Sequence, residues 1–317
     1  MISCLEIEKP ILELEDKVGE LISSSLDRDA DLTSGILLLR EKLDLLKEHF
    51  FLNLSPIEKV QMARHPQRPY PADYISLLFS DFLELHGDRR YADDRAVFGG
   101  FALFDQQPVM LIATRKGRDL ASNMACNFGC AHPEGYRKAW RLMRLADKVG
   151  APIITLVDTP GAYPGIGAEE RHIGEAIACN LRDMFRLSVP VISVITGEGG
   201  SGGALGISVA NRLLIMANAY YSVITPEGCA AILWRNNEAV PKAAEALKLT
   251  SDDLKNLKVA DEIVREPADG AHRDYQKAAE LLGEALLRHL QDLRKMSAEQ
   301  LRQDRYEKFR NLGLFLE

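Results

Sequence analysis

Two short β-branched segments that run into glycine-rich turns constrain the fold of this chain more than any other feature. Residues 153–157 lead into the turn DTPGAYPG, and residues 191–195 lead into GEGGSGG at 197–203. Each pattern predicts a buried strand, a turn that needs glycine, and a helix that begins directly afterwards. The first N–H groups of such a helix have no partner within it, so the sequence predicts a site for a phosphate, a carboxylate or a developing oxyanion.

The second turn is the more informative of the two. Five of its seven residues are glycine, which indicates a backbone that approaches another group closely. A single glycine-rich turn can equally be a steric corner, and two of them favour a functional interpretation. Neither turn has the Gly-Lys-Ser/Thr ending of a phosphate-binding loop or the spacing of a dinucleotide site.

Composition excludes several classes of protein. The formal net charge of -7 argues against a general nucleic-acid binder. No apolar run approaches the ~20 residues of a membrane span, and the acidic first twenty residues do not resemble a signal peptide, so we expect a cytoplasmic protein without membrane contact. The five cysteines do not suggest a disulfide framework. Cys126 and Cys130 lack a second ligand pair, so we expect no metal in this chain.

The chain divides into three predicted parts: an N-terminal helical segment at 1–54, an α/β core at 55–264 and a C-terminal helical extension at 265–317. The first part has two stretches with helical apolar spacing, joined by the polar residues 23–35. They are Ile7, Ile11, Leu14, Val18, Leu21 and Ile36, Leu39, Leu43, Leu46, Phe50. This pattern predicts a helical hairpin that packs either on the protein's own core or on a partner.

The predicted core begins with a helix at Ser55-Pro56-Ile57-Glu58, which has a capping box and a first-turn proline. A β-hairpin is expected from 97–104 and 108–114, and helices are expected at 134–149, 168–185 and 203–210. This order suits a spiral of ββα units at least as well as a doubly wound sheet. A second capping box at 297–300 predicts a helix in the C-terminal extension.

Several longer motifs resemble a known family. They are RHPQRPY at 64–70, GR at 117–118, NFG at 127–129, PEGYRK at 133–138, DTPGAYPG at 158–165, EGGSGGAL at 198–205 and PEGCA at 226–230. Together they resemble the α subunits of bacterial-type, heteromeric acetyl-coenzyme A carboxylase carboxyltransferases. The likeness runs end to end and is strongest at 63–234. One departure is the segment 120–126, which carries no Lys or Arg where the family tends to have several.

The resemblance implies a crotonase-like (ClpP/crotonase) superhelix and an α2β2 heterotetramer with a β subunit. It implies transfer of the carboxyl group of carboxybiotin, presented by the biotin carboxyl carrier protein, to acetyl-coenzyme A. The product would be malonyl-coenzyme A for fatty-acid synthesis. No covalently bound cofactor is expected, and the family's zinc belongs to the β subunit. We find no convincing ATP site in the sequence.

The same resemblance places the oxyanion donors at the backbone amides of Gly202 and Gly203. Gly161 and Ala162, expected to open the helix after the first turn, would shape the pocket together with Tyr163. Amides fixed in a site without water stabilise charge on the ureido oxygen of biotin, so no nucleophilic side chain or metal is required. We therefore expect His65 and His132 to be structural.

Two further pairs are candidate substrate-binding residues. Lys116 and Arg118 follow a predicted strand and could meet coenzyme A phosphates or acidic residues of the carrier protein, or they could be solvated at the surface. Glu227 and Gly228 could line the active-site wall, but a helix start explains them equally well.

Two other classes of function remain open beside the carboxyltransferase. One is another enzyme of the same fold, such as a hydratase or a Clp-type peptidase, with side-chain acid–base groups. The other is a noncatalytic scaffold subunit. The long motifs favour the carboxyltransferase.

Overall fold

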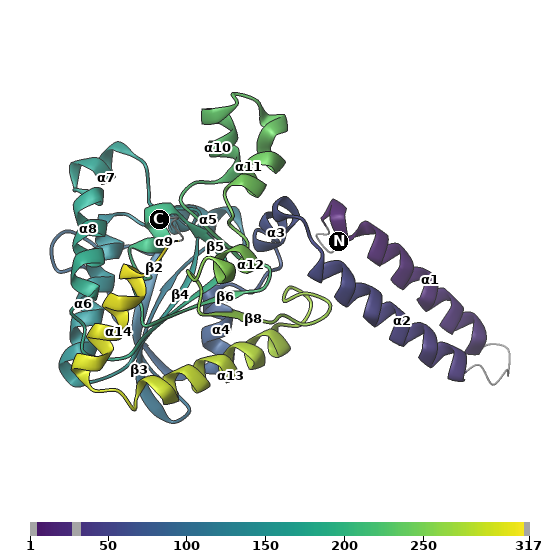
Figure 1. The fold of residues 1–317 in the computed structure, drawn as a ribbon, viewed down its shortest axis with the longest axis horizontal. Coiled ribbons are helices and arrows are strands. Elements are labelled where there is room, and N and C mark those ends of the chain that lie inside the picture. Colours follow the sequence, from purple (N-terminus) through teal and green to yellow (C-terminus); the bar gives the residue numbers. More distant parts are fainter. Residues whose placement is uncertain (1–4, 27–32, 314–317) are drawn as a thin grey trace.

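The computed structural model describes residues 5–26 and 33–313, which form a mixed β-sheet with helices on both sides and a helical hairpin that projects from it (Figure 1). The sheet has the strand order β1-β2-β3-β4-β5-β6-β8, and β7 pairs with β5 outside this path. The strands β1 (Ser80–Glu84), β2 (Val97–Phe104) and β3 (Gln107–Thr114) are antiparallel.

The hairpin between β2 and β3 is tighter than the sequence predicts. Asp105 and Gln106 alone form the turn, both with positive φ (49° and 59°), as a two-residue hairpin requires. Gln107, expected in the turn, already pairs with Phe104 as the first residue of β3. The strand positions of the hairpin are otherwise confirmed.

The parallel half of the sheet carries the two segments that precede the glycine turns. It consists of β3, β4 (Ile153–Thr159), β5 (Val191–Gly200), β6 (Arg212–Met216) and β8 (Glu262–Val264), and β7 (Tyr220–Ser222) pairs with the end of β5. Every residue of β4 and β5 is buried. Their continuous apolar runs are typical of parallel strands covered on both faces.

Long helices cover the sheet. On one side, α6 (Pro133–Val149) packs on β2, β3 and α8 (Ile173–Met184). On the other side, α13 (Tyr275–Leu293) packs on α4 (Pro71–Leu78), β5 and β8 (Figure 1). The C-terminal α14 (Ala298–Arg310) begins at the capping box predicted at Ser297 and contributes Leu301 to the main hydrophobic core.

Two predicted helices are wrong in extent. The stretch 168–185 forms α7 (Ile166–Glu170) and α8, separated at His172, whose φ of 63° is incompatible with a continuous helix. The stretch 203–210 forms only α9 (Ser201–Leu205), because the chain turns there to reach β6, which lies beside β5. The helix predicted from Ser55 is confirmed as α3 (Pro56–Ala63).

The N-terminal hairpin is confirmed as η1 (Glu6–Glu8), α1 (Lys9–Leu26) and α2 (Thr33–Leu52), whereas part of its predicted turn, 27–32, lies outside the described residues. It projects from the body and does not cover the sheet (Figure 1). Leu43 is buried as predicted, but Leu39 and Leu46, also expected in its seam, are exposed, and Phe51 is buried at the end of α2. Leucines lie on several faces of α2, so the spacing of its apolar residues was compatible with more than one buried face.

The remaining elements are short helices around the edge of the sheet. They are α5 (Leu120–Ala125), η2 (Asn127–Gly129), α10 (Pro226–Leu233), η3 (Asn237–Ala239), α11 (Val240–Ala246) and α12 (Ser251–Asn256). Within the described residues, every helix is too short or too polar to cross a lipid bilayer.

Candidate functional site

The two glycine turns meet at the carboxyl ends of β4 and β5. These strands are parallel neighbours, and their pairing continues as far as Thr159 and Gly199. The chain passes from β5 directly into α9, whose N-cap, Gly200, provides no side-chain hydrogen bond. The first N–H groups of α9 therefore lack both an intrahelical partner and a side-chain cap.

The backbones of the two turns touch. A Cβ atom on Gly203 would lie 2.4 Å from the carbonyl carbon of Gly161 and 2.6 Å from the amide nitrogen of Ala162. A Cβ on Gly200 would lie 2.1 Å from the oxygen of Pro160. Gly202 differs, because its nearest neighbour would be a side-chain carbon 3.5 Å away. The structure thus brings Gly161, Ala162 and Gly203 together, and a side chain at Gly200 or Gly203 would force a turn to move.

The first turn does not open a helix, so that part of the prediction is wrong. Ala162 forms a parallel bridge with Ala131, and the amide of Tyr163 donates to the Ala131 carbonyl at 2.9 Å. This extended segment delays the helix until Ile166. The half-buried ring of Tyr163 packs on His132 with 4.2 Å between centroids, which gives that histidine a packing partner.

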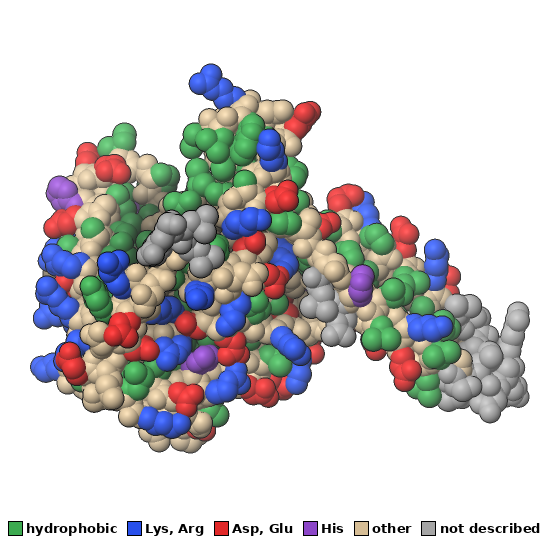
Figure 2. Space-filling view, viewed as in Figure 1, with side chains coloured by type: hydrophobic (Ala, Val, Ile, Leu, Met, Phe, Trp, Pro, Cys, Tyr) green, Lys and Arg blue, Asp and Glu red, His purple; other side chains and the backbone are tan. Residues whose placement is uncertain are grey.

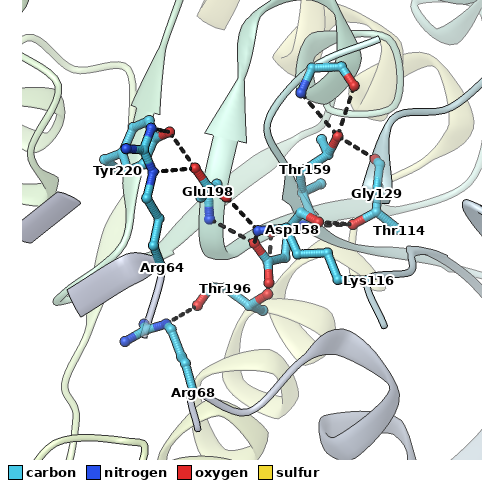
Figure 3. Close-up of polar contacts among 12 residues, drawn as sticks. Arg64, Arg68, Thr114, Lys116, Gly129, Asp158, Thr159, Thr196, Glu198 and Tyr220 are labelled. Carbon is cyan, nitrogen blue, oxygen red and sulfur yellow. Dashed lines mark hydrogen bonds and ion pairs between the residues drawn. The ribbon is translucent and has the colours of Figure 1, made fainter. Parts of the chain in front are cut away.

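A buried ion-pair network lies beneath the turns (Figure 3). The ammonium nitrogen of Lys116, which follows β3, lies 2.6 Å from Asp158 Oδ1 at the end of β4 and 2.6 Å from Glu198 Oε2 near the end of β5. The Glu198 amide also donates to Asp158 Oδ1 at 2.9 Å. Only 11% of the Lys116 side chain is exposed. One lysine therefore fixes the ends of three adjacent strands relative to one another.

Arg64 and Tyr220 complete the network from the other side of Glu198. Arg64 Nε and the Tyr220 hydroxyl donate to Glu198 Oε1 at 2.7 and 2.8 Å (Figure 3). Arg64 also pairs with Glu227 at 2.7 Å. Burial alone would raise the pKa of Glu198, but the charges of Lys116 and Arg64 prevail and lower that pKa to about 2. Glu198 is therefore a carboxylate at neutral pH.

The remaining candidate substrate-binding residues are engaged in contacts within the chain. Lys116 and Glu227 belong to the network. The Gly228 amide donates to Thr225 Oγ1 at 3.1 Å, which is the helix start that the sequence offered as an alternative. Arg118 donates to the Pro66 carbonyl at 2.8 Å and stacks 4.0 Å above the ring of Tyr70.

Sequence reasoning did not single out Arg64, Asp158, Glu198 or Tyr220 as site residues. A signal was nevertheless present for two of them. Asp158 and Glu198 are acidic residues at the ends of two buried apolar runs, and the carboxyl ends of adjacent parallel strands meet at one edge of a sheet. The contacts of Arg64 and Tyr220 depend on how distant segments pack, which no local pattern reveals.

The structure also forms a cluster of metal-ligand types that the sequence did not suggest. Among the described residues, only Glu8, His65 and His272 form a group of three with ligand atoms close enough to share an ion. The Gln67 amide donates to His65 Nδ1 at 3.1 Å, so a neutral His65 carries its proton on Nε2, which lies 3.2 Å from Glu8. That nitrogen then has no lone pair for a metal. The cluster instead joins the N-terminal segment to the core.

Among the described residues, neither Cys126 nor Cys130 belongs to a group of three or more side chains that could share a metal ion. Cys126 is buried, its thiol donates to the Ser122 carbonyl, and Cys130 is half-buried. Burial raises the pKa of both thiols. The protonated form, which does not bind zinc, is thereby favoured.

Two groups of short helices protrude from the body of the protein, one on each side of α9. They are α7 and the α10–α11 pair, with a notch between them (Figures 1 and 2). Each carries large exposed apolar side chains: Ile166 on α7, and Ile232 and Leu233 on α10. Contiguous exposed apolar patches mark interaction surfaces, so these side chains are candidates for contact with a partner.

Known proteins with similar folds include two carboxyl-group enzymes. The structure of transcarboxylase 12S, with methylmalonyl-coenzyme A bound, matches with a TM-score of 0.54 at 23% identity, over 68% of this chain and 41% of that chain. A malonate decarboxylase hetero-dimer from Pseudomonas matches with a TM-score of 0.55 at 19% identity, over 70% and 90%. These likenesses establish the fold, and the expected crotonase-like α/β architecture is confirmed.

Other known proteins share a much higher sequence identity with this chain than these structures do. A protein of Geobacter metallireducens called acetyl-coenzyme A carboxylase carboxyl transferase subunit alpha is 55% identical over 99% of this chain and 98% of its own length. A protein of the same name from Thermus thermophilus is 54% identical over 99% of both. The family described as acetyl co-enzyme A carboxylase carboxyltransferase-like matches residues 4–313. The chain therefore belongs to the acetyl-coenzyme A carboxylase carboxyltransferase-like family.

Proposed function

We propose that this chain is the α half of an acetyl-coenzyme A carboxylase carboxyltransferase. With a β-type partner it transfers the carboxyl group of carboxybiotin, carried by a biotin carboxyl carrier protein, to the methyl carbon of acetyl-coenzyme A. Malonyl-coenzyme A is the product. Relatives of more than 50% identity over nearly the full chain have the corresponding name, which supports this assignment.

The observation that carries the proposal is the contact between the two glycine turns at the uncapped start of α9. When the N–CO2 bond of carboxybiotin breaks, its electron pair remains on the ureido group and CO2 is released. In this proposal the amides of Gly202 and Gly203 donate to the ureido oxygen, and the position of both residues in the first turn of α9 supports it. Fixed donors of this kind stabilise developing charge by about 3 kcal/mol each.

The next steps need no side-chain nucleophile. The biotin nitrogen that lost the carboxyl group takes a proton from the acetyl methyl, and the resulting enolate attacks CO2 to form the new C–C bond. In this scheme the ion-pair network positions the turns and transfers no proton. Lys116, bonded to both Asp158 and Glu198, holds the strand ends from which the two turns emerge.

The site is proposed to be completed by the partner. The donors for the thioester oxygen of acetyl-coenzyme A would come from the β-type subunit, in an α2β2 assembly. The apolar residues Ile166, Ile232 and Leu233 on both sides of α9 would be covered by it. We further propose that this chain holds no metal or covalently bound cofactor, which elemental analysis of the purified chain tests.

Malonyl-coenzyme A decarboxylation in the presence of biotin tests the divided site. The α chain and its β partner are assayed separately and mixed, and we expect turnover only from the mixture. Full activity of the α chain alone would contradict the proposal. A hydratase would instead act on an enoyl thioester without a partner, and a scaffold subunit would support turnover whatever its glycine turns contain.

A further inference from the structure

A basic groove lies along the outer side of α6 and α8, lined by residues of both helices and of the loop before β2. It has a volume of about 840 Å³ and is lined by seven Lys or Arg residues but only three carboxylates. The whole chain, by contrast, has a formal net charge of -7. In Figure 2 basic side chains gather at the edge of the molecule where Figure 1 shows α6 and α8. The lining of the groove is therefore positively charged, although the protein as a whole is negatively charged.

The cations of α6 form one stripe. Arg137, Arg141, Arg144 and Lys148 follow one another at intervals of four, three and four residues, so they share one face of the helix. Like charges at these intervals destabilise a helix. Arg137 is neutralised by Asp88, at 2.9 Å, within the protein. Within the described ranges, no carboxylate lies at ion-pair distance from the other three.

Arg141 is held in place without being neutralised. Its Nε donates to the Gly87 carbonyl at 3.0 Å, and an Nη donates to the His86 carbonyl at 3.2 Å. The nearby Arg89 donates to the same His86 carbonyl at 2.7 Å. Burial and the charge of Arg89 lower the pKa of Arg141, and the charges of Asp93 and Asp88 offset this only in part. A guanidinium fixed by two carbonyls still has donors for a ligand.

An aromatic side chain lies beside these cations. Half-buried Trp140 lines this groove and also an adjoining hollow of about 370 Å³, which shares Arg144 and Lys148. The volume of the main groove lies within the range of small-molecule sites. Guanidinium groups bind phosphates through paired hydrogen bonds, and an indole ring offers a flat face for an organic group.

We propose that this groove binds an organic ligand with at least two phosphate groups. Arg141, Arg144 and Lys148 hold the phosphates, and the organic part of the ligand packs on Trp140. A nucleoside diphosphate and coenzyme A share this chemistry. The site does not depend on the proposed carboxyl transfer, so either can fail without the other.

Calorimetric titration of the purified full-length chain tests the proposal. The probes are inorganic pyrophosphate, ADP and coenzyme A, each at 50 and 300 mM NaCl. We expect ADP or coenzyme A, or both, to bind more tightly than pyrophosphate, and the higher salt concentration to weaken all binding. The organic probe with the lower dissociation constant shows whether the groove is suited to a nucleoside diphosphate or to coenzyme A. Failure of every probe to bind, or equal affinity for pyrophosphate and both organic probes, would overturn the proposal.

Matched variants locate the binding. Arg144→Gln removes an exposed charge without a carboxylate partner among the described residues, so its fold should persist, and we expect binding to weaken about tenfold. Arg141→Gln should weaken binding at least as much. Arg310→Gln, an exposed arginine at the end of α14, is the control and should bind normally. Unchanged affinity in Arg144→Gln would overturn the proposal. Hexaglutamate, a probe for acidic protein segments, should bind more weakly than ADP. Tighter binding of hexaglutamate would also overturn the proposal, because an acidic protein would then be the better occupant of the groove.

Discussion

The network beneath the glycine turns and the basic groove on α6 use the same residue types in opposite ways. In the network, Lys116 and Arg64 lie within 2.7 Å of carboxylates that are themselves nearly inaccessible. In the groove, Arg144 and Lys148 are exposed. The described part of the chain places no carboxylate within ion-pair distance of either.

The difference follows from solvation. A charge removed from water must be paired, because an isolated buried ion costs several kcal/mol. A charge at the rim of a groove keeps water around it, so it can remain unpaired until a ligand arrives. Paired cations therefore hold the backbone of the site in place, whereas unpaired cations remain available for binding.

Removal of the buried lysine should have the largest effect. Lys116→Met leaves buried Asp158 without its cation and Glu198 with Arg64 alone, and we expect a loss of about 3 to 5 kcal/mol in the free energy of unfolding. Urea denaturation at pH 7 measures it. Lys295→Met, at an exposed ion pair, should cost less than about 1 kcal/mol. Equal losses in the two variants would show that burial does not distinguish these cations.

The pH dependence of stability sharpens the same contrast. The pKa of Glu198 falls from its ordinary value of 4.5 to about 2 in the folded protein. Its contribution, on the order of 3 kcal/mol, is therefore complete above pH 4.5 and is lost as the pH falls towards 2. The stability gap between the wild type and Glu198→Gln should narrow over that interval.

Urea denaturation at several pH values between 5 and 2 measures this gap. Glu280→Gln, in an exposed pair with Lys277, serves as the control, and its gap should stay small at each pH. A Glu198→Gln gap of constant size across the series would mean that the ionised carboxylate contributes nothing special to the folded state.

A third test asks whether the exact position of the two glycine turns matters for catalysis. Gly203→Ala places a Cβ atom 2.4 Å from the Gly161 carbonyl carbon, so the two turns must move apart. A displacement of about 1 Å can cost roughly 10² in rate, and we expect kcat of the assembled enzyme to fall that far. Gly174→Ala, in α8, where an added Cβ would meet no atom beyond the local helix backbone within 4 Å, should leave kcat unchanged. Near-normal turnover of Gly203→Ala would remove the turn contact from the mechanism.

The smallest effect is expected in the groove. Arg144→Gln relieves repulsion from Arg141 and Lys148 on the same helix face, so stability should stay within about 0.5 kcal/mol of the wild type or rise slightly. Thermal unfolding without added phosphate measures the change. A large destabilisation would reveal a partner for Arg144 and would place it with the buried cations.

The strands β4 and β5 and the first helix of the core, α3, were predictable because their signals lie in a few neighbouring residues. Continuous β-branched runs predicted β4 and β5, and a capping box with proline predicted α3. The helix breaks at His172 and after Leu205 were not predictable, since the path to the next strand imposes them. The exposure of Leu39 and Leu46 was missed for a related reason: which face of α2 becomes buried depends on its position relative to the core.

The sequence by itself determined that two glycine turns follow two buried strands, and its motifs identified the family. Glycine content and apolar runs carry that information because they act on the nearest few residues. The tertiary structure alone decided that Gly203 packs on Gly161, and that Lys116 is bonded to Asp158 and Glu198. These partners are separated by about forty residues or more along the chain. They meet because parallel pairing aligns the strand ends at one edge of the sheet, and burial there requires every charge to be paired.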